Sequence, residues 1–116
     1  MKYFMAVIGN AETWQALGPE ETRAIYERMD VFNREMIDAG VLVSGAGLKD
    51  PSHSRTVRFD AAGRSVVTDG PFAEAKEQLA GYWVIECASE DEALGWATRA
   101  PMESSVIEVR PLEDEV

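Results

Sequence analysis

The sequence is short of cysteine, histidine and positive charge, and each shortage excludes a class of protein. Its only cysteine is Cys87, so no disulfide framework can form within the chain and no cluster of thiolates can bind a metal. Its only histidine is His53, and no pair of histidines or cysteines has the spacing of a zinc site. We therefore expect no metal ion, and the lack of any cofactor-binding motif predicts no cofactor.

Acidic residues outnumber basic ones. Lys and Arg number 11 against 21 Asp and Glu, which gives a net charge of −10. Binding to nucleic acid depends on neutralising phosphates with clustered Lys and Arg, and the basic residues here are few and dispersed. This balance excludes nucleic acid as a partner.

Long apolar runs are also missing. None approaches the roughly 20 residues that a transmembrane helix needs. The first stretch, MKYFMAVIG, has one basic residue and no signal-type cleavage region. We therefore expect no membrane partner and a location in the cytoplasm. The 116 residues, of which 46% are hydrophobic, suit one domain, 1–116, with its own core.

The clearest helix covers residues 19–40. Pro19 suits the first helical position, and Gly40 supplies a left-handed stop at the end. Between them an apolar stripe recurs at spacings of four, three and four, formed by Ile25, Met29, Phe32 and Met36. A second helix is predicted at 89–100, where Ser89 and Glu92 form a capping box.

The remaining elements are extended. We expect strands at 2–9, 41–48, 82–87 and 104–112, with a hairpin at 55–68 whose turn is DAAG. Small residues at 44–47 indicate a bulge or a close approach of two backbones. No internal repeat is visible.

The order of these elements predicts an α+β fold. Without the hairpin at 55–68, a ferredoxin-like βαββαβ arrangement remains, with two helices on one face of the sheet. However, strands 2–9 and 82–87 have large apolar residues at successive positions, so both faces of the sheet need cover. A second copy of the same sheet is the simplest cover, and we therefore expect a homodimer through the sheet faces.

One stretch carries a family resemblance. VVTDGPFAEAKEQLAGYWVIE, residues 66–86, resembles the DGPF-domain proteins of the YCII-related family, and so do AGVLVSGAGL, DEALGWATRAP and IEVRP. The match extends from Lys2 to Pro111. The resemblance implies a ferredoxin-like fold assembled as a dimeric α/β barrel. It implies no particular reaction.

Some relatives in the wider family resemble enzymes with a His–Asp pair in the cleft between sheet and helices, the histidine lying on the first helix. Residues 19–39 contain no histidine, so this pair is not transferred to the present chain. His53 lies instead in the polar loop DPSHSR, and we interpret it as a solvated loop residue.

Polar residues near the DGPF turn form the candidate site. Asp69 either accepts backbone N–H groups within the turn or acts as a catalytic general base or ligand anchor at the mouth of a cleft. Lys76 and Glu77 either begin a solvated helical turn or bind a small polar ligand. Tyr82 and the tryptophan after it point to opposite faces of a strand, and Tyr82 is the candidate for ligand contact. Phe72 is predicted to pin the turn to the core.

Two functions remain open, and the residues do not decide whether the protein is an enzyme. The first is binding or transformation of a small polar molecule in a cleft near the DGPF turn. The alternative is a non-catalytic accessory or regulatory protein that acts with an extracytoplasmic-function sigma factor. The resemblance suggests this alternative because many such proteins are encoded near sigma factors of that type, and the acidic surface suits a basic partner.

Overall fold

The structure of the protein is a computed structural model that describes residues 1–113. Its elements, in chain order, are β1 (Lys2–Asn10), α1 (Ala11–Gln15), α2 (Pro19–Asp38), β2 (Leu42–Gly47), the 3-10 turn η1 (Pro51–His53), β3 (Arg55–Phe59), β4 (Ser65–Asp69), β5 (Glu77–Glu86), α3 (Glu90–Arg99) and β6 (Ser105–Pro111). None of the helices within residues 1–113 is both long enough and apolar enough to cross a membrane.

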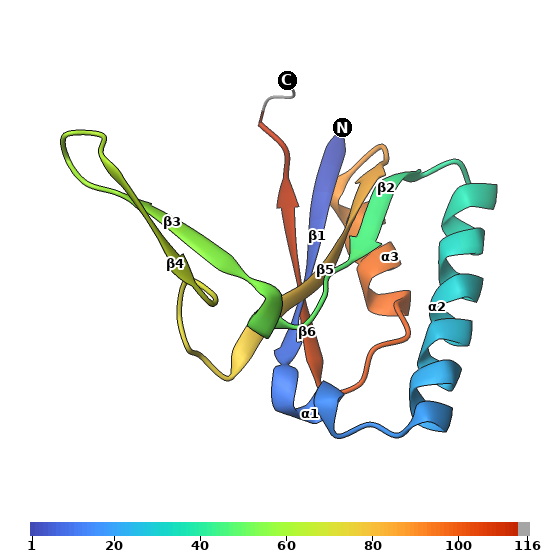
Figure 1. Ribbon diagram of the computed structural model, residues 1–116. Coiled ribbons are helices and arrows are strands. Elements are labelled where there is room, and N and C mark those ends of the chain that lie inside the picture. Colours follow the sequence, from blue (N-terminus) through green and yellow to red (C-terminus); the bar gives the residue numbers. More distant parts are fainter. Residues whose placement is uncertain (114–116) are drawn as a thin grey trace.

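Four strands form the main sheet, in the order β2-β5-β1-β6, and every pair is antiparallel. The helices α2 and α3 lie on one side of it (Figure 1). This α+β architecture is compatible with the ferredoxin-like fold that the element order predicts. The predicted irregularity in the second strand is also present, since the register of β2 against β5 shifts between Leu42 and Ser44.

The core lies between this sheet and the helices. Tyr3, Met5 and Val7 of β1 point into it, and Met5, Met36 and Ile85 are its largest fully buried side chains. Phe32 and Met36 are the two residues of the predicted α2 stripe that are fully buried. The core is apolar throughout, because no polar or charged residue within residues 1–113 is buried.

The helix ends match their sequence signals. Pro19 begins α2, and Gly40, just past its end, has a φ of +73°, the left-handed conformation that favours glycine. Ser89 caps α3 by accepting a hydrogen bond from the Glu92 backbone N–H. The two helices are tied together by an ion pair between Glu35 and Arg99, with an N–O distance of 2.7 Å.

Among residues 1–113, no helix lies on the opposite face of the sheet, which we call the open face. Phe4 and Tyr82 lie there as half-buried side chains, and their rings stack with centroids 5.4 Å apart. Leu79 and Val106, at its margins, are exposed. The two-faced pattern of β1 is therefore real, and one of its two apolar faces is uncovered in the single chain.

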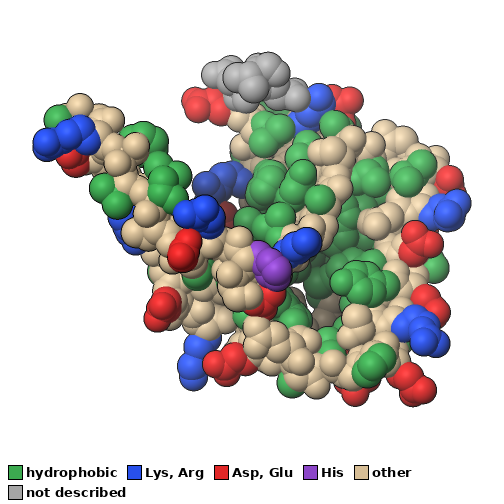
Figure 2. Space-filling view, in the orientation of Figure 1, with side chains coloured by type: hydrophobic (Ala, Val, Ile, Leu, Met, Phe, Trp, Pro, Cys, Tyr) green, Lys and Arg blue, Asp and Glu red, His purple; other side chains and the backbone are tan. Residues whose placement is uncertain are grey.

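β3 and β4 form a separate two-stranded sheet. They pair only with each other, from Arg55 opposite Asp69 to Phe59 opposite Ser65. We call residues 55–69 the arm. It projects from the body on the side away from α2, and hydrophobic side chains gather over the strands between the arm and α2 (Figures 1 and 2).

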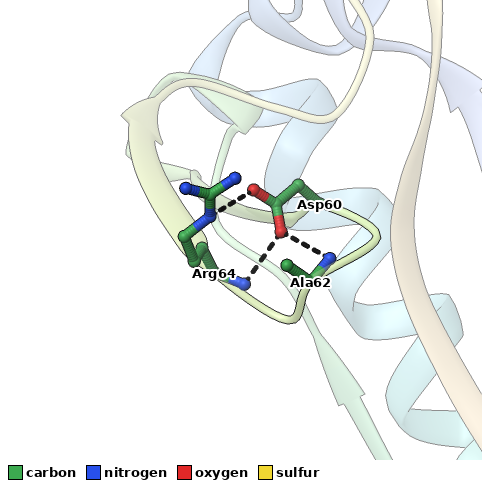
Figure 3. A network of polar contacts seen from close by, with 3 residues as sticks. All are labelled: Asp60, Ala62 and Arg64. Carbon is green, nitrogen blue, oxygen red and sulfur yellow. Dashed lines mark hydrogen bonds and ion pairs between the residues drawn. The ribbon is translucent and has the colours of Figure 1, made fainter.

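Asp60 organises the tip of the arm (Figure 3). Its carboxylate accepts hydrogen bonds from the backbone N–H groups of Ala62 and Arg64, at 2.9 and 3.0 Å, and from Arg64 Nε at 2.8 Å. These bonds, with the backbone of Arg64 as the largest cause, lower the pKa of Asp60. The tip is thus held by local contacts and not by packing.

The structure differs from the prediction at the start of β5, at the turn before it and in the connector after β1. β5 begins at Glu77, five residues before the predicted strand, because residues 77–81 continue the ladder with β1 as far as Asn10. Of the two alternatives for Lys76 and Glu77, the helical turn is wrong, since this segment leads into a strand. A short helix, α1, also forms where a connector was expected, with Asn10 as its cap.

Candidate functional site

The DGPF turn fastens the end of the arm to its beginning. Gly70 has a φ of +97°, which a residue with a side chain rarely adopts. Its N–H donates to the Ser54 carbonyl at 2.7 Å, and its own carbonyl accepts a hydrogen bond from Thr56 Oγ1 at 2.8 Å. The glycine is therefore required by the geometry that closes the base of the arm.

Asp69 ends β4 and faces solvent. Its side chain is 90% exposed, and its Oδ1 lies 3.2 Å from Nε of Arg55, the residue opposite it in the hairpin. An exposed pair of this kind adds little stability. Both the carboxylate and the guanidinium beside it are therefore accessible to a ligand.

Phe72 does not pin the turn to the core, so that prediction is wrong. The ring is 76% exposed, with the guanidinium carbon of Arg58 5.3 Å from its centroid. Arg58 Nη2 also donates to the Phe72 carbonyl at 3.1 Å. The physical reason is that the turn sits at the base of the arm, away from the helices that cover the core.

Lys76 and Glu77 are exposed on the segment that leads into β5, and within residues 1–113 neither has an ion-pair partner. The segment is held by Gln78, whose Nε2 donates to the carbonyls of Ala73 and Ala75 at 2.8 and 2.9 Å. Tyr82 lies further along β5, on the open face. The structure shows no direct contact between Asp69 and any of these candidates.

A hollow of about 570 Å³ lies between the base of the arm and the start of β5. We call it the arm hollow. Pro71 and Phe72 of the DGPF turn line it, but Asp69 does not. The polar residues of its lining include Lys49, Asp50, His53, Arg55 and Gln78, and the apolar ones include Leu48, Val57, Phe72 and Leu79.

Asp50 contributes a fixed negative charge to the lining of the hollow. Its Oδ2 accepts from the Ser52 N–H at 3.0 Å and its Oδ1 from Gln15 Nε2 at 2.5 Å. Hydrogen bonds from Ser52 and then Gln15 lower the pKa of Asp50, and His53 lowers it further. Asp50 therefore stays ionised next to His53, which lies at the end of η1 with its side chain exposed.

The sequence did not single out Lys49, Asp50 or Gln78 as site residues. The one available signal was the concentration of polar residues in KDPSHS, which alone reads as an ordinary loop. These residues become a wall only because the two ends of the arm return to the same place. No three His, Cys, Asp or Glu side chains in the described part of the chain converge as metal ligands do.

A second, larger concavity of about 660 Å³ runs along the first half of α2. It is lined by Thr22, Tyr26, Met29 and Asn33 among others. Asn33 is fixed there, because its Oδ1 accepts a hydrogen bond from Trp83 Nε1 at 2.7 Å. Every lining residue comes from the stretch 19–33, so this is one face of a helix and not an enclosed site.

Comparison with known proteins places the chain in a family. A sequence profile described as the YCII-related domain matches residues 1–115. The chain belongs to the YCII-related family. An uncharacterised protein of Rhizobium meliloti (strain 1021) is 36% identical to it over 115 residues, which cover 97% of this chain and 92% of that protein.

The single histidine of this YCII-related protein lies in the arm hollow and not on α2. His53 lies on η1 and lines the arm hollow, whereas α2 carries none. The concavity on α2 is therefore lined by no histidine, whereas the arm hollow is lined by His53.

Proposed function

We propose that this YCII-related protein is a homodimer that binds a small polar molecule in the arm hollow, beside the DGPF turn. The observation that carries the proposal is the hollow itself. Its volume of about 570 Å³ lies in the range of small-molecule sites, roughly 300–1,000 Å³. Its lining combines charged groups with an exposed aromatic ring, which suits a ligand that has both polar groups and a flat or apolar part.

Each residue has a role in this proposal. Lys49 and Arg55 offer cationic donors, and Phe72 offers a face for stacking. Asp69 does not itself line the hollow but pairs with Arg55, which does, and it is our candidate to accept a proton if the bound molecule is also transformed. Lys76 and Glu77 directly precede Gln78, which lines the hollow, but they do not line it themselves.

Tyr82 is assigned to the interface between the two copies. It lies on the open face, stacked on Phe4, and the face that it shares with Leu79 adjoins the hollow. A second copy on the open face would then narrow the mouth of the arm hollow and exclude water from it.

A thermal-shift screen tests the proposal. A ligand at ten times its Kd stabilises the native state by about 1.4 kcal/mol, which raises the Tm of a chain of this length by about 6 °C. We expect at least one compound in a panel of small metabolites to do so with the wild type. A tenfold weaker affinity in Asp69→Asn would reduce the rise to about 2 °C.

Asp60→Asn is the matched control, because Asp60 is also an arm carboxylate paired with an arginine but lies at the far end of the arm. It should leave the rise unchanged. Absence of a shift with every compound would contradict ligand binding and favour the alternative, an accessory or regulatory protein that acts with an extracytoplasmic-function sigma factor. The net charge of −10 is the observation that supports the alternative, because it suits a basic protein partner.

A further inference from the structure

The single chain has more surface than a protein of its mass normally exposes. Its accessible surface is 8350 Å². A compact monomer of 12.8 kDa is expected to expose about 6,300 Å². Its radius of gyration is 16.1 Å, against about 13.4 Å for a compact domain of this length. About 2,000 Å² of surface is therefore surplus, and the projecting arm is its visible source (Figure 1).

One face of the arm is apolar and uncovered. Val57, Phe59 and Val67 share this face, because Val57 and Val67 are paired in the hairpin and Phe59 lies two residues further along β3. Phe59 is 71% exposed and Val67 54% exposed. A two-stranded hairpin is marginally stable at best without further packing, so this face needs a partner.

The apolar face of the arm begins next to the open face of the sheet. Val57 of the arm and Leu79 of the open face line the same hollow, so the two surfaces meet at an inner corner. A protein bound to the open face would therefore also contact the arm. The space-filling view shows this corner between the arm and the strands (Figure 2).

The distribution of charge favours a second copy of this chain as the protein bound there. Residues 55–69 have three arginines against two aspartates, so the arm has a net charge of +1 on a chain whose total is −10. The rest of the chain then carries −11. A weakly basic arm is attracted to the acidic body of a second copy, whereas two acidic bodies alone repel each other.

We propose that the arm is a clasp that holds a dimer together. Its Val57–Phe59–Val67 face packs onto a second copy bound at the open face, and the arm of that copy contacts the first in the same way. The proposal rests on the homodimer of the proposed function and adds the arm as the element that holds it. If dimerisation buries the surplus accessible surface of each copy, the interface buries about 4,000 Å² in total, which is within the range of obligate homodimers, about 2,000–5,000 Å². The reciprocal contact is what a two-fold interface requires.

Two neighbouring valines give a matched test. Val67 lies on the apolar face of the arm, while Val66, 62% exposed, points to the other face beside Arg58. We expect Phe59→Ala combined with Val67→Ala to weaken dimerisation by at least about thirtyfold, as the loss of an anchoring aromatic does. Val66→Ala should change it less than threefold. Analytical ultracentrifugation over a concentration series gives both dissociation constants, and circular dichroism verifies that each variant is folded.

Each experimental result tests a different part of the proposal. A wild type that is monomeric at micromolar concentration overturns the homodimer and the clasp together. A dimer that is unaffected by the double variant overturns the clasp and leaves a dimer through the sheet faces. Equal weakening by Val66→Ala overturns the assignment of the contacting face. Hydrogen exchange at residues 57–67 adds a second readout, since protection should appear only at concentrations where the dimer forms. The thermal-shift screen is independent of these results.

Discussion

Gly47 and Gly81 lie opposite each other across β2 and β5, yet only one of them has room for a methyl group. A Cβ on Gly81 would lie 2.8 Å from the Ala46 carbonyl oxygen and 3.3 Å from Cα of Gly47, and both of these atoms belong to the backbone. A Cβ on Gly47 would meet nothing within 4 Å. The pair therefore provides the same substitution at the same place in the sheet, with and without a steric conflict.

We predict that Gly81→Ala is destabilising by about 1–3 kcal/mol, the usual cost of overpacking, because two strands must separate to admit the methyl group. Unfolding a chain of 116 residues has an entropy of about 0.24 kcal/mol/K at the midpoint, so each kcal/mol lowers Tm by about 4 °C. The expected loss is about 4–12 °C. Gly47→Ala should be neutral or stabilising by up to about 1 kcal/mol, since alanine restricts the unfolded chain.

Thermal and urea unfolding at one fixed protein concentration measure both variants, because the Tm of an oligomer depends on concentration. A Gly81→Ala protein within 1 °C of the wild type would refute the close approach of β2 and β5. An equal loss in Gly47→Ala would show that alanine itself, and not the conflict, is responsible. The result also concerns the site, because Leu48 and Leu79, just beyond these two glycines, line the arm hollow.

Two further predictions concern single hydrogen-bonded groups. Trp83→Phe removes the bond to Asn33 and some packing of the buried ring, and we expect a coupling energy of about 1 kcal/mol with Asn33→Ala in a double-mutant cycle of urea unfolding; additive effects would contradict the bond. Asp60 has a pKa lowered from 3.8, chiefly by the Arg64 backbone N–H, so its stabilisation of the arm is present above pH 3.8 and is lost as the pH falls through the lowered value. In a pH titration, the amide chemical shifts at the tip of the arm should change with that loss in the wild type and not in Asp60→Asn. Identical titration curves in the two proteins would exclude Asp60 as the cause of the change.

Local signals in the sequence predicted the elements that local chemistry controls. The bounds of α2 follow from Pro19 and Gly40, and its buried side follows from the spacing of Phe32 and Met36. Tyr82 and Trp83 were correctly assigned to opposite faces, since adjacent strand residues must alternate.

Features that depend on distant partners were not predictable in the same way. Glu77 and Gln78 have no strand preference, and they join β5 because β1 extends far enough to pair with them. Phe72 was assigned to the core because large aromatic residues usually pack there, yet its position depends on where the arm leaves the body. The walls of the arm hollow come from residues 48–57 and 71–79, which no spacing rule brings together.

The DGPF turn connects the two proposals, because one backbone conformation serves both. The positive φ of Gly70 turns the chain out of the arm, and its bonds to Ser54 and Thr56 fix the exit of the arm to its entry. The arm hollow lies directly beyond this closure, so its shape depends on the same bonds that set the direction of the arm. Phe72 then follows Pro71 into the hollow with its ring exposed, where a ligand can reach it. A chain in which Gly70 could not adopt its conformation would therefore lose the direction of the clasp and the wall of the site together.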